Sequence, residues 1–415
     1  MNKRASPGRR ILRWLLGAGL IAGLVLVGMF AALNRWPSLG AQGADLLRAA
    51  IGDKAVAALE AGVFTVQDSF QQWSYDLGWT KPILPAGAPT PVAVFSTATP
   101  PSMTLAATPS PSLTAPAQAL TTLPPILTVS PIPTSTPWQP ASLVPLTSLR
   151  GEGGWSPYIQ DATGRTVAYL TSFQPDLGRA YAVAAVVAFD LHLTRLHFVL
   201  GTVQPYAPNS PPRTGAIPTA DRAPGVLLAM FNGGFKAQQG QFGAMADGVV
   251  ALPAREGLGT LAIGQEGDVH IGEWGVDMIA SPYWVAWRQN GPLVIQHGAI
   301  NPRVYNDSPS DWGYVVGGGS PTWRSAIGLS SDGMTLYYVC GPSLTIEALA
   351  DSLIAAGATE AIQLDINPYW VHFVAVRTDG KKLTLEPLFP AQMNDNIDRY
   401  LWNYTRDYFY VTAGP

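Results

Sequence analysis

Between residues 317 and 373 the spacing of apolar positions changes twice, and each period predicts a different element. Apolar runs of strand length predict β-strands at 325–329, 334–340 and 361–366. From residue 346 to 354 apolar residues recur every three or four positions, as on one side of a helix, with Thr345 as the N-cap and Gly357 at the end. Pro342 is expected to end the second strand.

The last of these strands carries one acid, Asp365, near its carboxyl end. The chain then breaks at Asn367-Pro368, so this carboxylate is expected at the edge of a sheet. Functional side chains are commonly held at such places, on loops that a rigid scaffold positions. An acid that only caps the following turn is the alternative interpretation.

Elsewhere in the C-terminal two thirds of the chain, strand patterns outnumber helical ones. The further predicted strands are 166–170, 180–190, 193–200, 226–231, 260–263, 269–271, 373–376 and 382–385. Turn sequences such as Asp379-Gly380 join neighbouring strands as hairpins. Residues 150–415 are thus expected to form an α+β domain with a mixed or mostly antiparallel sheet core and a few covering helices.

The strand at 226–231 leads directly into the segment Asn232-Gly233-Gly234-Phe235-Lys236. Glycine lets a backbone approach a ligand closely or take a positive φ. Asn232 can donate and accept hydrogen bonds, and Lys236 supplies a positive charge. The segment is a candidate ligand-binding turn, and a tight exit from the strand with a solvated lysine is the alternative.

The N-terminal residues 1–36 have the pattern of a membrane segment. Residues 14–33 are uncharged and apolar, which is long enough to cross a hydrocarbon core of about 30 Å. The residues before them include Lys3, Arg4, Arg9, Arg10 and Arg13. By the positive-inside rule the N-terminus is then cytoplasmic and the rest of the chain lies outside the cell membrane. A cleaved signal peptide is the alternative, with small residues at 31 and 32.

Two segments separate this membrane span from the distal domain. Residues 37–80 have apolar positions at helical intervals, which predicts a membrane-proximal helical hairpin or a stalk. Residues 81–149 are rich in Pro, Ser, Thr and Ala, and from residue 82 onward they contain no charged side chain. Such a composition is typical of a disordered, extended linker.

Composition excludes several classes of function. The 415 residues are 13% charged with a net charge of −3, so no basic surface for nucleic acid is indicated. The single cysteine, Cys340, rules out an intrachain disulfide and a cysteine-rich zinc site. The five histidines lack the spacing of metal ligands, so we predict neither a metal nor a cofactor.

Three segments, in this order, resemble the phosphodiester glycosidase family. They are Asn-Gly-Gly-Phe at 232–235, Arg-Ser-Ala-Ile-Gly at 324–328, and the helix-to-strand unit that ends in Leu364-Asp365. The resemblance extends from about residue 151 to the C-terminus and implies a hydrolase that cleaves sugar-1-phosphodiesters. Many family members continue after this aspartate with glycines and a serine, whereas residues 366–370 here are Ile-Asn-Pro-Tyr-Trp. The chain therefore resembles a divergent branch.

The implied reaction assigns roles to particular side chains. A carboxylate would stabilise the positive charge that grows at the anomeric carbon, and cations would stabilise the departing phosphate. Asp365 is the candidate carboxylate, Asp247 the possible second one, and Arg324 the phosphate clamp, since a guanidinium can bind two oxygens at once. The candidate substrate-binding residues are Asn232, Gly233, Gly234, Lys236 and Arg255.

We therefore expect a single-pass membrane protein whose extracytoplasmic domain hydrolyses a sugar-1-phosphodiester in surface glycans or their precursors. Its partners would be that glycan or sugar phosphate and the bilayer, through residues 14–33. The alternative is a non-catalytic glycan-binding or envelope module with the same fold, which the sequence of residues 366–370 favours. The two hypotheses differ in whether Asn232, Arg324 and Asp365 converge on one pocket.

Overall fold

The computed structural model describes residues 37–87, 138–143, 154–206, 212–306, 308–313, 318–380 and 382–414. The expected membrane span at 14–33 and most of the expected linker at 81–149 lie outside these ranges. Among the helices within them, none is both long and apolar enough to cross a bilayer.

Strands dominate the described residues, in three sheets. The first contains β1 (Ser156–Gln160), β2 (Thr166–Phe173), β3 (Ala184–Asp190), β11 (Leu293–Gln296), β12 (Ala299–Ile300), β13 (Thr322–Leu329), β14 (Thr335–Leu344) and β15 (Glu360–Ile366). The second contains β6 (Ala244–Ala246), β7 (Val249–Leu252), β8 (Gly259–Gly264), β9 (Val269–Glu273) and β10 (Trp284–Gln289). The third contains β4 (Thr194–Val199), β5 (Leu227–Asn232), β16 (Phe373–Asp379), β17 (Lys382–Pro387) and β18 (Tyr408–Ala413).

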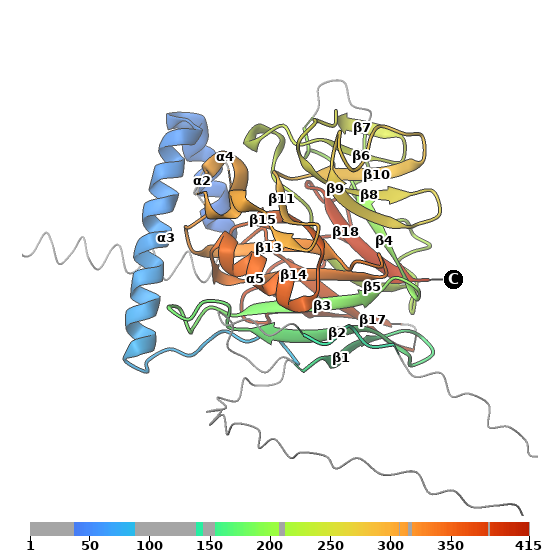
Figure 1. The fold of residues 1–415 in the computed structure, drawn as a ribbon, viewed down its shortest axis with the longest axis horizontal. Helices are drawn as coiled ribbons and strands as arrows, with labels where there is room; N and C mark the ends of the chain where they lie inside the picture. Colours follow the sequence, from blue (N-terminus) through green and yellow to red (C-terminus); the bar gives the residue numbers. More distant parts are fainter. Residues whose placement is uncertain are drawn as a thin grey trace, which may run out of the picture.

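Few helices accompany these sheets. The helices of the described ranges are α2 (Pro37–Ile51), α3 (Asp53–Asp76), α4 (Pro309–Trp312) and α5 (Ile346–Ala356), with 3-10 turns η1 (Ala237–Gln239) and η2 (Pro302–Tyr305). Each pair of neighbouring strands assigned in these ranges is antiparallel. The expected sheet-rich α+β class is confirmed (Figure 1).

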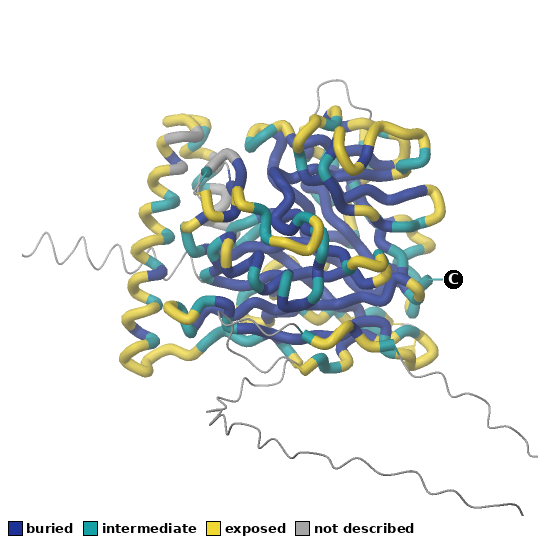
Figure 2. The backbone as a smooth tube through the Cα atoms, viewed as in Figure 1, coloured by how far each residue is buried: buried dark blue, intermediate teal, exposed yellow. Residues whose placement is uncertain are grey.

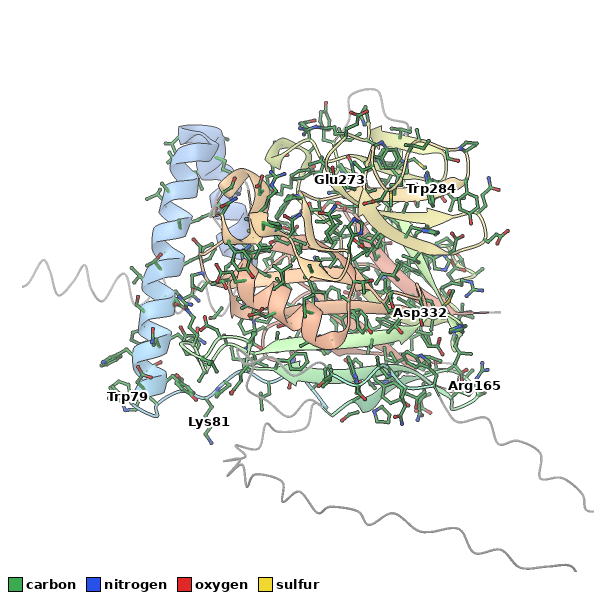
Figure 3. The ribbon with its side chains drawn as sticks, in the orientation of Figure 1. Trp79, Lys81, Arg165, Glu273, Trp284 and Asp332 are labelled. Carbon is green, nitrogen blue, oxygen red and sulfur yellow. The ribbon has the colours of Figure 1, made fainter. Side chains whose placement is uncertain are left out.

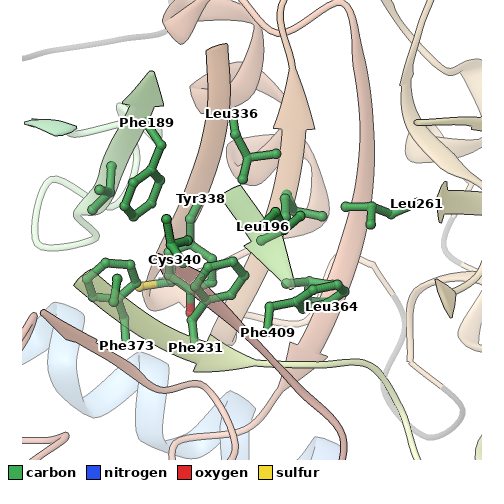
Figure 4. Close-up of a cluster of buried hydrophobic side chains, with 14 of the residues drawn as sticks. Phe189, Leu196, Phe231, Leu261, Leu336, Tyr338, Cys340, Leu364, Phe373 and Phe409 are labelled. Carbon is green, nitrogen blue, oxygen red and sulfur yellow. The ribbon is translucent and has the colours of Figure 1, made fainter. Parts of the chain in front are cut away.

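The main hydrophobic core contains side chains of all three sheets. Figure 4 shows part of it, where aromatic side chains of the first and third sheets pack together. Phe231 of β5 packs against Tyr338 of β14 and Phe373 of β16, with ring centroids 4.7 and 6.0 Å apart. Cys340 is fully buried in the same cluster, where it packs as a small apolar side chain.

The predicted strand–strand–helix–strand order from β13 to β15 is confirmed. Thr345 caps α5, because its side chain accepts a hydrogen bond from the Ala348 backbone N–H, and Gly357 ends the helix with φ 98°. The expectation that Pro342 ends the second strand is wrong, since β14 continues to residue 344. Beyond Cys340, β14 pairs with β13 alone, so a proline without an N–H is tolerated there.

The helix pair α2–α3 stands at one edge of the sheets (Figure 1). An ion pair of 2.7 Å between Arg48 and Glu60 joins the two helices. Asp68 of α3 attaches the pair to the sheet domain, since it accepts hydrogen bonds from Arg179 (2.9 Å) and Tyr181 (2.6 Å). Figure 2 shows that much of α3 nevertheless remains exposed, in contrast to the buried strands beside it.

Candidate active site

Three segments that are distant in sequence meet where β5 and β15 end and β18 begins. The Asp365 backbone N–H donates to the Gly233 carbonyl oxygen at 3.0 Å. The Gly233 N–H in turn donates to the Asp407 carbonyl oxygen at 3.2 Å. These backbone hydrogen bonds fix the predicted carboxylate beside the Asn-Gly-Gly turn, as the sequence motifs required.

Asp365 is a buried carboxylate with a charged partner. Its side chain pairs with the guanidinium of Arg406 through Oδ2 and Nη2, and its Oδ1 accepts from the Ile366 N–H at 2.9 Å. The residue is 4% exposed. Burial raises the pKa of this carboxyl from 3.8 to about 6, although the Arg406 charge opposes the shift. The group can therefore change protonation near neutral pH.

Two cations and one indole surround this carboxylate. The Arg406 guanidinium carbon lies 4.3 Å from the ring centroid of Trp370, and the Lys236 Nζ lies 5.1 Å from it. Arg406 also donates to the Gly234 carbonyl oxygen at 2.8 Å. Lys236 is buried, and its charge lowers the pKa of Asp365. The arrangement concentrates positive charge where an anionic group could bind.

Gly233 and Gly234 are required by close packing. A Cβ on Gly233 would overlap the Asp407 carboxylate, and a Cβ on Gly234 would lie 2.9 Å from the guanidinium carbon of Arg288. Asp407 and Arg288 form a fully buried ion pair of 2.8 Å. The same Asp407 oxygen accepts from the Gly234 N–H at 3.0 Å. The two glycines therefore let the turn lie directly on this ion pair.

Arg324, the predicted phosphate clamp, forms its hydrogen bonds with other residues of the protein. It is fully buried, and its guanidinium donates to the backbone carbonyls of four residues and to the Gln363 side chain. Those carbonyls belong to Trp312, Gly318, Ser320 and Leu344. A guanidinium that binds these oxygens fastens loops inside the fold, and the phosphate-clamp role of Arg324 stays a prediction. The cation in contact with Asp365 is Arg406 instead.

The Asn232 side chain also forms its hydrogen bonds with other residues of the protein. Its Nδ2 donates to Ser325 Oγ (2.9 Å) and to the Gly233 carbonyl (3.1 Å). Its Oδ1 accepts from Tyr338 Oη (2.8 Å) and from the His372 N–H (3.1 Å). Because both donors and both acceptor positions are used inside the protein, this asparagine holds the end of β5 in place.

Asp247 and Arg255 lie on exposed turns. Asp247 has φ 52° in the turn between β6 and β7, and it lines a groove with His197 and Tyr410. Arg255 donates to the Gly240 carbonyl at 2.6 Å and so fastens the turn after η1. The carboxylate whose charge raises the pKa of Asp365 is Asp407, so Asp407 is the second acid of this site.

Sequence reasoning missed Arg406, Asp407, Arg288 and Trp370. One signal was present, because Arg406-Asp407 is a charged pair immediately before the aromatic run that forms β18. Arg288 similarly interrupts the apolar strand β10. In the described ranges, no group of three His, Cys, Asp or Glu side chains is arranged to bind a metal ion.

One comparison with known proteins, a family model, agrees with the motifs. Residues 226–365 match the family model described as phosphodiester glycosidase, which confirms the expected family for this segment; its members are hydrolases. Among solved structures, the catalytic domain of zebrafish N-acetylglucosamine-1-phosphodiester alpha-N-acetylglucosaminidase, auto-inhibited by its pro-peptide, is similar, with 15% identity and a TM-score of 0.37. That alignment covers 67% of this chain and 87% of the zebrafish chain.

A second similar structure is a hypothetical protein from Synechocystis, with 11% identity and a TM-score of 0.39. The alignment covers 62% of this chain and 64% of the Synechocystis chain. A search of curated proteins found no match to this sequence.

Proposed function

We propose that the domain spanning residues 150–415 is a phosphodiester glycosidase that hydrolyses a sugar-1-phosphodiester with Asp365 as its catalytic carboxylate. The observation that carries the proposal is the contact of this buried carboxylate with Arg406, beside Lys236, at the end of the segment that matches the family. One negative and two positive groups thus lie close together, which is the combination of charges that the reaction requires.

The proposed reaction is hydrolysis at the anomeric carbon. A water molecule adds to this carbon and loses a proton to ionised Asp365, while the bond between the carbon and the phosphate oxygen breaks. The phosphate keeps the electron pair of that bond and leaves as a phosphomonoester. A base whose pKa is about 6 suits this step at neutral pH.

Arg406 and Lys236 are proposed to bind the phosphate group. Both cations lie against Trp370, which is half-buried, and residues 366–370 form a partly exposed stretch next to Asp365. A phosphate that binds Arg406 competes with Asp365 for the guanidinium and so releases the carboxylate for catalysis. Substrate binding and activation of the base are thereby coupled.

The proposed location is the outer face of a cell membrane. Residues 14–33 would anchor the chain with its N-terminus in the cytoplasm, and the linker at 81–149, uncharged from residue 82 onward, would hold the domain away from the bilayer. Surface glycans or their lipid-linked precursors are then the substrates within reach. This location rests on the sequence pattern of residues 1–149.

The second candidate function is a non-catalytic glycan-binding module. It is favoured by the burial of Asp365, which is only 4% exposed and already paired with Arg406. In that case the ion pair would be a structural feature, and Trp370 would serve as a surface for sugar stacking.

Release of free sugar by the purified full-length chain tests the proposal. The substrates would be a nucleotide sugar and a lipid-linked sugar phosphodiester. Asp365→Asn is expected to lower turnover about 10²- to 10⁴-fold, as for other general bases. The matched control is Asp379→Asn, which changes an exposed acid at the end of β16, next to the hairpin turn to β17, and should keep full activity. Glycan binding without any turnover in the wild-type chain would support the second candidate.

A further inference from the structure

Helix α3 carries an exposed apolar stripe, which we call the α3 seam. Its members are Leu59, Val63, Val66, Phe70, Trp73 and Leu77, the last at the C-cap of the helix. Successive members are four, three, four, three and four residues apart, and each is between 47% and 71% exposed. A continuous apolar stripe of this kind on a soluble domain usually marks an interaction surface.

The seam lies on an exposed flank of α3, and one member, Phe70, also lines a groove against Pro342 and Pro368 of the sheet domain. Asp68 and Gln71 lie on the side of the helix that contacts the domain, where Asp68 binds Arg179 and the Gln71 side-chain oxygen accepts a hydrogen bond from Ser343 Oγ. Figures 1 and 2 show α3 at the edge of the molecule, with exposed positions along most of its length. Trp79, labelled in Figure 3, packs against Trp73 with ring centroids 5.0 Å apart, and each member of the seam is still at least 47% exposed.

The seam is narrow. Exposed polar residues flank it on one side: Thr65, Ser69, Gln72 and Asp76. Only two of every seven positions are therefore apolar and exposed, which is the a/d pattern of a coiled-coil seam, whereas a helix that lies on a broad surface has a wider apolar face. At 1.5 Å per residue, the seam from Leu59 to Leu77 is roughly 27 Å long.

Charge argues against a lipid surface as the cover of the seam. The sequences of α2 and α3 contain five acidic and two basic residues, so the net charge of the two helices is −3. The acids are Asp45, Asp53, Glu60, Asp68 and Asp76, and the bases are Arg48 and Lys54. Amphipathic helices that lie on membranes are typically rich in Lys and Arg, because biological membrane surfaces are negative. A second helix with the same seam requires no such complementary charge.

We infer that the α3 seam pairs in parallel with the α3 seam of a second copy of this chain. A two-fold axis makes one apolar stripe complementary to itself. Anchoring through residues 14–33 would deliver both helices from the same side of the membrane, so they run in the same direction, and it raises their effective concentration. In the paired seam, Leu59, Val66 and Trp73 occupy the d positions.

Cysteine cross-linking of the full-length chain in its membrane tests this pairing. The one native cysteine, Cys340, is fully buried, so any disulfide between two chains is expected to form through the introduced cysteine. Val66→Cys is expected to form a covalent dimer on mild oxidation, because two d-position Cβ atoms come within reach of a disulfide. Thr65→Cys, one residue away on the polar flank, is the matched control and should remain a monomer on a non-reducing gel.

A measurement of mass separates pairing through the seam from pairing elsewhere. The detergent-solubilised wild-type chain is expected to have twice the mass of the monomer by light scattering. Val66→Glu should reduce this mass by half, whereas Thr65→Glu should leave it unchanged. Both positions are exposed, so neither substitution disturbs the core of the domain.

Three results would overturn the inference. The first is a wild-type chain that remains monomeric, and the second is equal cross-linking of the two cysteine variants. The third is contact with lipid: a fluorophore attached to Val66→Cys and strongly quenched by brominated lipid would place the seam in the bilayer. None of these readouts depends on sugar release, so the result is independent of the catalytic proposal.

Discussion

The candidate active site and the α3 seam differ in which kinds of side chain are exposed to water. At the site, Asp365, Arg406, Asp407 and Arg288 are charged and almost fully buried. Along the seam, large apolar side chains are half or more exposed. Both arrangements oppose the usual distribution, in which charges contact water and apolar groups do not.

The two departures have different energetic supports. The buried charges are balanced by one another and by backbone groups, such as the Gly234 N–H on Asp407 and the Gly234 carbonyl on Arg406. The exposed seam has no comparable charge or hydrogen-bond support among the described residues, and we expect a partner to cover it. A buried charge network therefore indicates an internal function, and an exposed apolar stripe indicates an external contact.

The largest expected effect comes from breaking the buried ion pair. Asp407→Asn leaves the Arg288 charge buried without its counter-charge, which should lower the free energy of unfolding by about 3–5 kcal/mol. Denaturant unfolding of the solubilised chain measures this loss. Asp379→Asn, an exposed acid, is the control and should change stability by less than about 0.5 kcal/mol. Equal midpoints for the two variants would contradict a structural role for the pair.

A smaller effect is expected from Arg406, and it should appear in turnover. Arg406→Gln removes the guanidinium proposed to stabilise the leaving phosphate, so kcat/KM should fall about 10²-fold or more. Arg324→Gln is the informative contrast, because its guanidinium binds loop carbonyls and its loss should lower the unfolding midpoint instead. If turnover of the folded protein fell only in the Arg324 variant, the cation would have been wrongly assigned.

The sequence predicted the elements of the fold better than the side chains of the site. The period of apolar positions gave β13, β14, α5 and β15, because burial on one side of an element leaves a local pattern. Thr345 and Gly357 were found for the same reason, since helix caps depend on neighbouring residues. Local chemistry therefore sufficed for this part of the chain.

The partners of Asp365 could not be found in this way. Arg324 and Arg406 are equally plausible cations in the sequence, and only the packing of β18 beside β5 brings Arg406 to the carboxylate. Asn232 was expected at the substrate for its hydrogen-bonding groups, and the fold uses all of them. Contacts between distant segments, which leave no spacing signal, decided both cases.

The pH dependence of activity should report the burial of Asp365. If the ionised carboxylate is the base, kcat/KM rises with pH through about 6, the pKa in the folded protein. The Arg406 charge lowers this pKa, so any residual activity of Arg406→Gln should rise at a higher pH than in the wild type. A profile that is flat between pH 5 and 7 would argue against Asp365 as the base.

The same carboxyl should affect stability with the opposite trend. Its folded pKa is raised above the unfolded value, so between about pH 4 and 6 the folded chain binds more protons than the unfolded chain. Its contribution to the free energy of unfolding is therefore full below about pH 4 and is lost as pH rises through about 6. Asp365→Asn should remove this dependence, which unfolding midpoints measured across that range would show.

The smallest expected effect on the isolated domain comes from the seam. Val66→Ser shortens an exposed side chain, so the stability of a monomer should change by less than about 0.5 kcal/mol. A paired seam adds a dependence on concentration, because association stabilises the folded state by mass action. The unfolding midpoint of the wild-type chain should then rise with protein concentration, and that of Val66→Ser should rise less. Identical concentration dependence in the two proteins would mean that the exposed stripe of α3 has no part in association. The seam would then no longer indicate an external contact, and only the interpretation of the buried site would stand.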